Sequence, residues 1–279
     1  MLIKIDNLVD LALDEDAAFG DVTSQSVFPV DHVSQARILA RQDMVICGLE
    51  IAKRVFLRLD PGLKVDFEVK EGEPVATGTV VMRIKGSTIS LLTAERTALN
   101  FLQRLTGIAT LSRQYADEAA KVGTGVRIVD TRKTTPGWRA LEKYAVRCGG
   151  CFNHRSSLGE HVLIKENHIA AAGSLAKAVG LARDNAPHCA KIEVETENLN
   201  DVEEALKAGA EVIMLDNMSP AQIEQAVSLI NKAAIIEVSG GVSLSTVADY
   251  ALPGVDVISV GALTHSAPAA DFSMIVFNE

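Results

Sequence analysis

Residues 191–216 read KIEVETENLNDVEEALKAGAEVIMLD, and this stretch decides the fold. Its two apolar segments, 191–195 and 211–216, flank a helical segment, so the stretch predicts a strand, a helix and a second strand. Segments of the same kind occur on both sides, and the later ones recur about every twenty residues. The predicted strands are VRIVD (126–130), VLIK (162–165), KIEVE (191–195), EVIMLD (211–216), AIIEVS (234–239) and VDVISVG (255–261).

Each predicted strand ends in a polar residue or a glycine. In chain order these residues are Asp130, Lys165, Glu195, Asp216, Ser239 and Gly261. Near-continuous apolar strands are typical of sheets covered on both faces, and α/β barrels carry their chemistry at the carboxyl ends of the strands. The sequence therefore predicts an α/β fold with an α/β barrel and an active site at that face. Because six strands are recognisable and a full barrel has eight, we expect an incomplete barrel.

The N-terminal part of the chain has a different pattern. A helix is predicted before a turn at Gly20, a strand within 34–49 and a second helix at 48–59. Residues 63–87 alternate between apolar and polar side chains, like two antiparallel strands. This mixture predicts a small α+β domain.

A long helical stretch at 88–122 follows, and we expect a break in it near Thr106. We place the domain junction at this break. The N-terminal domain is then residues 1–108 and the barrel domain is residues 109–270.

The charge of the chain limits its function. The formal net charge is −9, which argues against a general binder of nucleic acid or anionic membrane. Cations nevertheless gather between Val129 and Ile169, which predicts a pocket for a small polyanion. They are Arg132, Lys133, His154, Arg155 and Lys165.

The N-terminus gives no sign of a targeting segment. It turns acidic too early for a signal or transit peptide. No apolar run approaches the roughly 18 residues that span a bilayer. We therefore expect a cytoplasmic protein.

The last two predicted strands are followed by small residues, at Ser239-Gly240-Gly241 and at Gly261. Free backbone N–H groups at such positions commonly bind phosphate in barrels. The carboxylates of Glu195 and Asp216 could hold Mg²⁺ or ribose hydroxyls. Because arginine side chains match carboxylates geometrically, the whole set suits a phosphorylated sugar and a carboxylated partner.

Other patterns favour structural interpretations. Arg139, Lys143 and Arg147 have helical spacing and are read mainly as a solvated or ion-paired face. His154, His161 and His168 recur every seven residues, but an intervening strand separates them, so we assign them no shared face and no metal. The CxxC at Cys148 and Cys151 is read as free thiols. The sequence has no phosphate-binding GxxxxGK[ST] loop, dinucleotide-binding GxGxxG or hydrolase GxSxG motif.

Collinear motifs along nearly the whole chain resemble the quinolinate phosphoribosyltransferase family, also called nicotinate-nucleotide pyrophosphorylase (carboxylating). DTRKTTPG, NHR and LIKENHI are the most specific of them. The matching segments are EDAAFGDVTS (15–24), ERTALNFLQRLTGIAT (95–110), DTRKTTPG (130–137), LEKYAVRCGG (141–150), NHR (153–155), LIKENHI (163–169), EVE (193–195), IMLDN (213–217), EVSGG (237–241) and ISVGALTHS (258–266). Cys151 stands where the family usually has a third glycine.

The resemblance implies an N-terminal α+β sandwich, joined by the tail 271–279, packed with an incomplete α/β barrel. It implies at least a homodimer, in which Arg96 reaches into the site of the partner. The resemblance implies Arg96, Arg132, His154, Arg155 and Lys165 as ligands of quinolinate. It implies Lys133, Glu195, Asp216, Ser239, Gly240, Gly241, Gly261 and His265 as ligands of the phosphoribosyl group. Lys133, Lys165, Glu195 and Asp216 are the implied catalytic residues, with Mg²⁺ near the last two.

The activity implied is transfer of phosphoribosyl from 5-phosphoribosyl-1-pyrophosphate to quinolinate with decarboxylation, a step of NAD biosynthesis. The products are nicotinate mononucleotide, CO₂ and pyrophosphate. Two alternatives stay open at this point. One is a paralogue of the same fold associated with molybdate transport, and the other is a non-catalytic phosphosugar-binding protein.

Overall fold

The computed structural model describes residues 2–277, which form two compact units. The N-terminal unit consists of the described residues up to Arg113, Thr135–Gly150 and the segment from Ala267 onward. The barrel unit consists of Gln114–Thr134 and Cys151–Ser266.

The domain boundaries predicted from the sequence, 1–108 with 271–279 and 109–270, stay a prediction. The compact units differ from that division chiefly at Thr135–Gly150, which packs with the N-terminal unit. Residues 1, 278 and 279 of the predicted domains lie outside the described residues.

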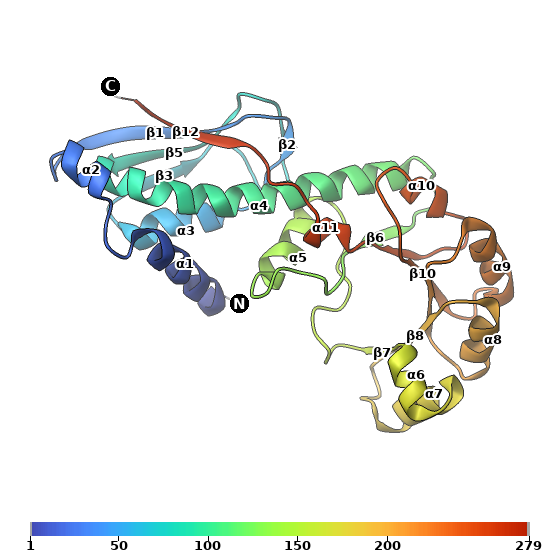
Figure 1. The fold of residues 1–279 in the computed structure, drawn as a ribbon. Helices are drawn as coiled ribbons and strands as arrows, with labels where there is room; N and C mark the ends of the chain where they lie inside the picture. Colours follow the sequence, from blue (N-terminus) through green and yellow to red (C-terminus); the bar gives the residue numbers. More distant parts are fainter. Residues whose placement is uncertain (1, 278–279) are drawn as a thin grey trace. The chain divides into compact units, whose positions relative to one another are not determined.

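The N-terminal unit is built on a four-stranded antiparallel sheet in the order β12-β1-β5-β3 (Figure 1). The tail strand β12 pairs along the whole of β1 except its first two residues. Two short strands, β2 and β4, form a separate antiparallel pair. The bounds are β1 (Val33–Ala40), β2 (Met44–Val45), β3 (Lys64–Phe67), β4 (Pro74–Val75), β5 (Val80–Ser87) and β12 (Phe272–Phe277).

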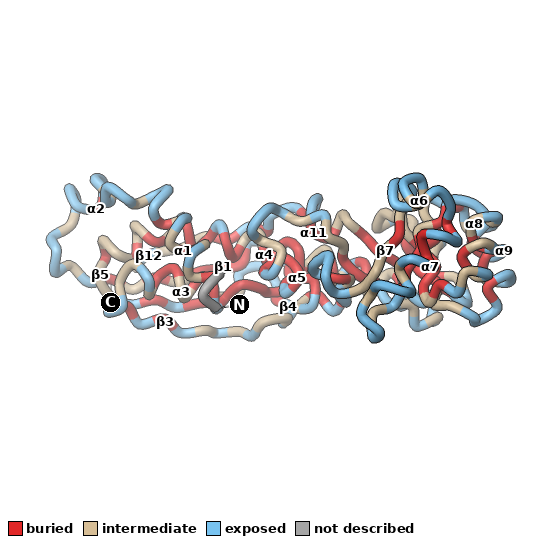
Figure 2. The backbone as a smooth tube through the Cα atoms, turned by 90° about the horizontal axis from the view of Figure 1, so that it is seen from below, coloured by how far each residue is buried: buried red, intermediate tan, exposed pale blue. Residues whose placement is uncertain are grey.

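Helices complete this unit, and the mixture confirms the predicted α+β fold. Buried side chains of α3, α4 and the sheet form its core, whereas α2 is exposed along most of its length (Figure 2). The helices are α1 (Leu2–Ala17), α2 (Val22–Val27), α3 (Leu49–Leu59), α4 (Thr88–Ala120) and α5 (Arg139–Cys148).

Helix α4 is continuous, so the predicted break near Thr106 is wrong. Gly107 lowers the intrinsic helix stability by about 1 kcal/mol. The adjacent Leu105 and Ile108 are fully buried, and burial of one such side chain contributes about 2 kcal/mol. Packing therefore outweighs the glycine. No helix in the described residues has the length and apolar character needed to cross a membrane.

The barrel unit contains a six-stranded parallel sheet in the order β6-β11-β10-β9-β8-β7. Each of the six strands predicted from the sequence is present. Among the described residues no pairing joins β6 to β7, so the barrel is open between them, as predicted. The bounds are β6 (Arg127–Val129), β7 (Val162–Ile164), β8 (Ile192–Thr196), β9 (Val212–Asp216), β10 (Ile235–Ser239) and β11 (Val257–Ser259).

Helices alternate with these strands, and α7, α8 and α9 lie beside one another outside the sheet (Figure 1). Their starts are set by local sequence. The side chains of Ser174 and Asn198 cap α7 and α8, and Ser219 with Gln222 forms a capping box on α9. The helices are α6 (Glu166–Ala172), α7 (Leu175–Asn185), α8 (Leu199–Lys207), α9 (Pro220–Ile230), α10 (Val247–Tyr250) and α11 (Ala262–His265).

Candidate active site

The parallel order of the sheet brings the carboxyl ends of its strands to one edge, and the first of them anchors the NHR segment. Asp130, directly after β6, is fully buried. Its carboxylate accepts hydrogen bonds from Asn153 Nδ2 at 2.6 Å and from the backbone N–H of His154 at 3.0 Å. Asp130 therefore positions the segment that carries His154 and Arg155.

His154 lies between two buried carboxylates inside the barrel. Its Nε2 is 3.5 Å from Glu193 Oε2 and 3.4 Å from Glu237 Oε1. Burial by itself lowers the pKa of His154, and the Arg155 N–H that donates to Nδ1 opposes a second proton. The two carboxylates outweigh burial and raise the pKa of His154 to about 9.

His161 belongs to the same cluster. Its Nε2 lies 2.9 Å from Glu193 Oε2, and its ring centroid lies 5.1 Å from that of His154. Burial alone raises the pKa of Glu193, but hydrogen bonds from His154 and His161 lower it to about 2. The inference that these two histidines share no face is wrong, because the loop between them returns His161 to the barrel interior. His168 is separate and accepts the Lys165 N–H at 2.9 Å.

The folded pKa of His154, about 9, lies above its ordinary value of 6.5, so its ion pairs stabilise the fold fully below pH 6.5 and are lost as pH rises through 9. We expect the free energy of unfolding to fall by about 3 kcal/mol across this window. Urea unfolding at several pH values measures the change. His154→Gln should flatten the profile, whereas substitution of the exposed His188 by glutamine should not. An unchanged slope in His154→Gln would assign the effect to another group.

Arg155 and Arg132 form a pair of like charges. Arg155 is 9% exposed, and its Nη1 donates to the His161 carbonyl at 3.0 Å. Burial lowers the pKa of Arg155, and the nearby charge of Arg132 lowers it further. The charges of Glu193 and Glu160 act on Arg155 in the opposite direction. Planar carboxylates match the geometry of guanidiniums, so this pair suits an anionic ligand.

Lys165 and Glu195 come from neighbouring strand ends and form an ion pair between Lys165 Nζ and Glu195 Oε2. Asp216 ends the next strand, β9, and its Oδ2 accepts a hydrogen bond from Asn217 Nδ2 at 2.7 Å. The structure thus places the two predicted carboxylates on adjacent strands, with a lysine beside the first.

The Ser239-Gly240-Gly241 turn is locked to the end of β9. The Asn217 N–H donates to the Ser239 carbonyl at 2.9 Å. Gly240 has a φ of +87°, and a Cβ there would lie 2.3 Å from Asn217 Oδ1. Only glycine fits this position without displacing Asn217. The turn therefore presents backbone rather than side chains at the strand ends.

Gly240→Ala should weaken the binding of a phosphorylated sugar about tenfold or more, because the turn must shift to relieve the contact. Isothermal titration calorimetry measures this affinity. Gly180→Ala in α7 is the control, since a Cβ there meets nothing within 4 Å. An affinity within twofold of the unmodified protein would remove the turn from the predicted phosphate site.

Gly261 brings Lys133 and His265 together. Measured from the point that a Cβ on Gly261 would occupy, Lys133 Cδ is 3.2 Å away and His265 Nε2 is 3.1 Å away. The Thr264 hydroxyl donates to the Lys133 carbonyl at 2.7 Å, which ties the Lys133 loop to α11. Two side chains predicted to bind phosphate thus meet beside the last strand end.

Arg96 belongs to the N-terminal unit, and its part in the site stays a prediction. It is exposed on α4 and lines a cavity of about 280 Å³ between α1 and α4. The cavity is lined by Leu8, Leu11, Ala12, Glu15, Asp16, Arg96, Thr97, Asn100, Phe101 and Trp138.

The basic face predicted for α5 is only partly solvated. Arg147 is exposed and Arg139 half-buried, whereas Lys143 is 6% exposed and the intervening Glu142 is fully buried. Glu142 Oε1 accepts hydrogen bonds from Arg104 Nη2 at 2.8 Å and from the Thr135 hydroxyl at 2.8 Å. This ion pair holds the start of the Thr135–Gly150 segment to α4.

Sequence reasoning missed Glu193 and Glu237. A signal was present, because each stands two residues before a predicted site residue in its strand, at Glu195 and Ser239. Alternate residues of a strand share a face. A carboxylate in the middle of an otherwise apolar strand therefore indicates a buried partner of opposite charge.

These features define an α/β-barrel protein with a glycine turn, two neighbouring arginines and a lysine–carboxylate pair at the carboxyl ends of its strands. Comparison with known families matches residues 21–106 to the quinolinate phosphoribosyl transferase N-terminal domain and residues 108–275 to its C-terminal domain. The chain therefore belongs to the quinolinate phosphoribosyl transferase family.

Individual relatives agree with this assignment. A protein of Synechocystis named probable nicotinate-nucleotide pyrophosphorylase (carboxylating) is 46% identical over 98% of this chain and 92% of its own length. A Bacillus subtilis protein of the same name is 42% identical over 94% of this chain and 90% of its own length. The crystal structure of NadC from Streptococcus pyogenes is 40% identical, covers 100% of this chain and 99% of its own, and has a TM-score of 0.94.

Proposed function

We propose that this protein transfers the phosphoribosyl group of 5-phosphoribosyl-1-pyrophosphate to quinolinate with decarboxylation, giving nicotinate mononucleotide, CO₂ and pyrophosphate in NAD biosynthesis. The observation that carries the proposal is the guanidinium pair of Arg132 and Arg155 in a barrel unit that also holds the Lys165–Glu195 pair at its strand ends. The names of the relatives support the same reaction. No comparison favours the molybdate-transport paralogue.

The cations select the dicarboxylate substrate. Arg132 and Arg155 bind the carboxylates of quinolinate, and Lys165 contributes a third positive charge. His154 lies between the Glu193 and Glu237 carboxylates, which offset any charge it carries, so the positive charge for the substrate comes from Arg132, Arg155 and Lys165. A dicarboxylate satisfies this group better than nicotinic acid, which carries a single carboxylate.

The other substrate lies along the strand ends of β8 to β11. The Ser239–Gly241 turn, Gly261, Lys133 and His265 hold its 5′-phosphate through backbone N–H groups and two basic side chains. Glu195 and Asp216 then face the ribose. With quinolinate at the cations and the phosphoribosyl group along the strand ends, the ring nitrogen of quinolinate faces the anomeric carbon.

Charge stabilisation drives the transfer. Loss of pyrophosphate leaves positive charge on the ribose ring, and Glu195 and Asp216 stabilise that charge as it develops. The new bond makes the pyridine nitrogen positive. The C2 carboxylate leaves as CO₂, and its electron pair stays on C2, where the adjacent positive nitrogen stabilises it. A proton from solvent then completes the C2–H bond, and Lys133 and Lys165 are the ammonium groups that assist.

We propose that Mg²⁺ enters with 5-phosphoribosyl-1-pyrophosphate. The donor chemistry fits, since Asp216 presents a half-buried carboxylate at a strand end and Mg²⁺ prefers such oxygens. The ion, when bound, would neutralise charge on the departing pyrophosphate. Glu195 is held by Lys165, so Asp216 is the better ligand of the two.

The deciding experiment incubates the purified protein with quinolinate, 5-phosphoribosyl-1-pyrophosphate and Mg²⁺ and follows nicotinate mononucleotide by chromatography. We expect product from quinolinate, little from nicotinic acid, and none when a chelator removes Mg²⁺. Binding of both substrates without product would favour the non-catalytic phosphosugar-binding alternative.

We also propose a homodimer in which the N-terminal region of one chain completes the barrel site of the other. Exposed apolar side chains in the N-terminal region support an interface with a second chain. Phe19 is 100% exposed, Val22 73% and Val27 62%. The cavity beside Arg96 gives this surface a recess. A cytoplasmic location stays a prediction.

A further inference from the structure

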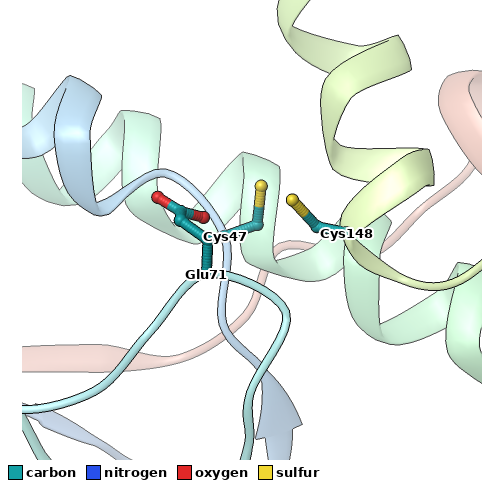
Figure 3. A group of neighbouring side chains, drawn as sticks. All are labelled: Cys47, Glu71 and Cys148. Atoms are coloured by element: carbon teal, nitrogen blue, oxygen red, sulfur yellow. The ribbon is translucent and has the colours of Figure 1, made fainter.

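A second group of chemically reactive side chains lies in the N-terminal unit and includes none of the residues assigned to catalysis. It consists of Cys47 between β2 and α3, Glu71 between β3 and β4, and Cys148 at the end of α5. One ligand atom from each lies within 4.8 Å of the other two. Figure 3 shows the two sulfur atoms side by side, with the Glu71 carboxylate next to Cys47.

The three side chains of the group lie close together. The Cys47 sulfur is near both the Cys148 sulfur and the Glu71 carboxylate. Cys47 is fully buried, whereas Cys148 is half-buried. Cys148 therefore faces a cysteine far away in the sequence, and the CxxC spacing with Cys151 is not the pairing that the structure forms.

The backbone around the group is fixed before any ligand arrives. The Thr106 hydroxyl accepts the Cys47 N–H at 3.1 Å and donates to the Cys47 carbonyl at 2.8 Å. The Gly48 N–H donates to Glu71 Oε2 at 2.9 Å. The Gly72 N–H donates to the Ile46 carbonyl at 2.8 Å. These hydrogen bonds fix Cys47 and Glu71 in place, so little conformational entropy would be lost when a ligand binds to them.

We propose that Cys47, Glu71 and Cys148 bind one thiophilic divalent ion of the Zn²⁺ class. Two thiolates and a carboxylate supply three ligands of a tetrahedral site, and water can take the fourth position. Binding releases the two thiol protons to solvent, so the three negative charges meet an ion of charge +2. Sulfur ligands select against Mg²⁺, which separates this site from the ion that accompanies the substrate.

Cys148 lies in a segment of the sequence that connects two groups of predicted site residues. The segment Thr135–Gly150 begins directly after the loop of Arg132 and Lys133 and ends shortly before Arg155. Glu142 already ties the start of this segment to Arg104. An ion between Cys148 and Cys47 ties its end. The bound ion should therefore stabilise the Thr135–Gly150 segment, which lies in the sequence between Arg132 and Lys133 on one side and Arg155 on the other.

The test uses the full chain, kept reduced, stripped of metal with a chelator and titrated with Cd²⁺ alone. We expect one Cd²⁺ per chain with ultraviolet absorption from thiolate-to-metal charge transfer, displacement by Zn²⁺, and a higher thermal midpoint. Cys47→Ser and Cys148→Ser should each lose the absorption. Cys189→Ser, at an exposed cysteine outside the group, is the matched control and should keep it.

A second measurement guards against variants that fail to fold. In the unmodified protein, Zn²⁺ should protect Cys47 and Cys148, but not Cys189, from an alkylating reagent, as mapped by mass spectrometry. An ion held instead by His154, His161 and Glu193 would give neither the thiolate absorption nor the protection. Either that result, or a reduced protein that binds no Cd²⁺ and forms a Cys47–Cys148 disulfide on exposure to peroxide, would overturn the proposal.

Discussion

Replacing Lys133 with alanine should lower kcat by about two to four orders of magnitude and leave the protein folded. The Lys133 side chain passes Gly261 beside His265, so its ammonium group reaches the phosphate side of the site. It also follows Arg132 directly in the sequence, on the side of the dicarboxylate. Removal of this charge weakens stabilisation of both anions in the transition state.

The fold should survive because the structural contact of Lys133 is made by its backbone. The carbonyl accepts the Thr264 hydroxyl, and alanine keeps that bond. The side chain is exposed, and such substitutions usually change stability by about 0.5 kcal/mol or less. Thermal unfolding and steady-state kinetics on the same preparation separate the two effects.

Lys191→Ala is the matched control. Lys191 is exposed and directly precedes β8, at the opposite end of the sheet from the strand ends that carry the site. The same change of charge there should leave kcat unchanged. Near-normal turnover of Lys133→Ala would remove Lys133 from the mechanism, and equal losses in both variants would point to a general effect of charge.

The strands of the barrel were predictable because burial on both faces leaves a simple signature. In EVIMLD the four residues between Glu211 and Asp216 are apolar, and the structure ends β9 at Asp216. The same logic placed Lys165 and Glu195 at strand ends, but their ion pair was not predicted. Adjacent parallel strands bring their carboxyl ends together, so two strand-end residues of opposite charge on neighbouring strands can meet.

The pairing of distant segments could not be predicted in the same way. His154 and His161 meet because the loop between them folds back. Neither the periodicity nor the spacing of the sequence predicts this loop conformation. The contact of Cys47 with Cys148 depends on where α5 packs, which is set by the buried Glu142 and Arg104. A pattern-based reading sees charges at helical spacing in α5, but burial decides whether they meet solvent or one another.

Replacing Arg96 with alanine should remove most of the kcat/KM for quinolinate, because the proposed homodimer uses this residue in the site of the partner. Arg96 is exposed, so the change should leave stability within about 0.5 kcal/mol. The loss should appear mainly as a raised KM for quinolinate, since a guanidinium that binds a carboxylate contributes to binding in the ground state. Arg58→Ala, at an exposed surface ion pair of the same unit, is the control.

Mixing two inactive variants tests whether Arg96 acts across the interface. In a dimer of one Arg96→Ala chain and one Lys133→Ala chain, the first chain has an intact barrel and receives Arg96 from the second. Random exchange of subunits of a two-fold dimer should therefore restore about a quarter of the unmodified activity. If Arg96 acted within its own chain, every site in the mixture would lack one of the two residues. Mixing would then restore no activity, because each chain would have one of the two substitutions in its own active site.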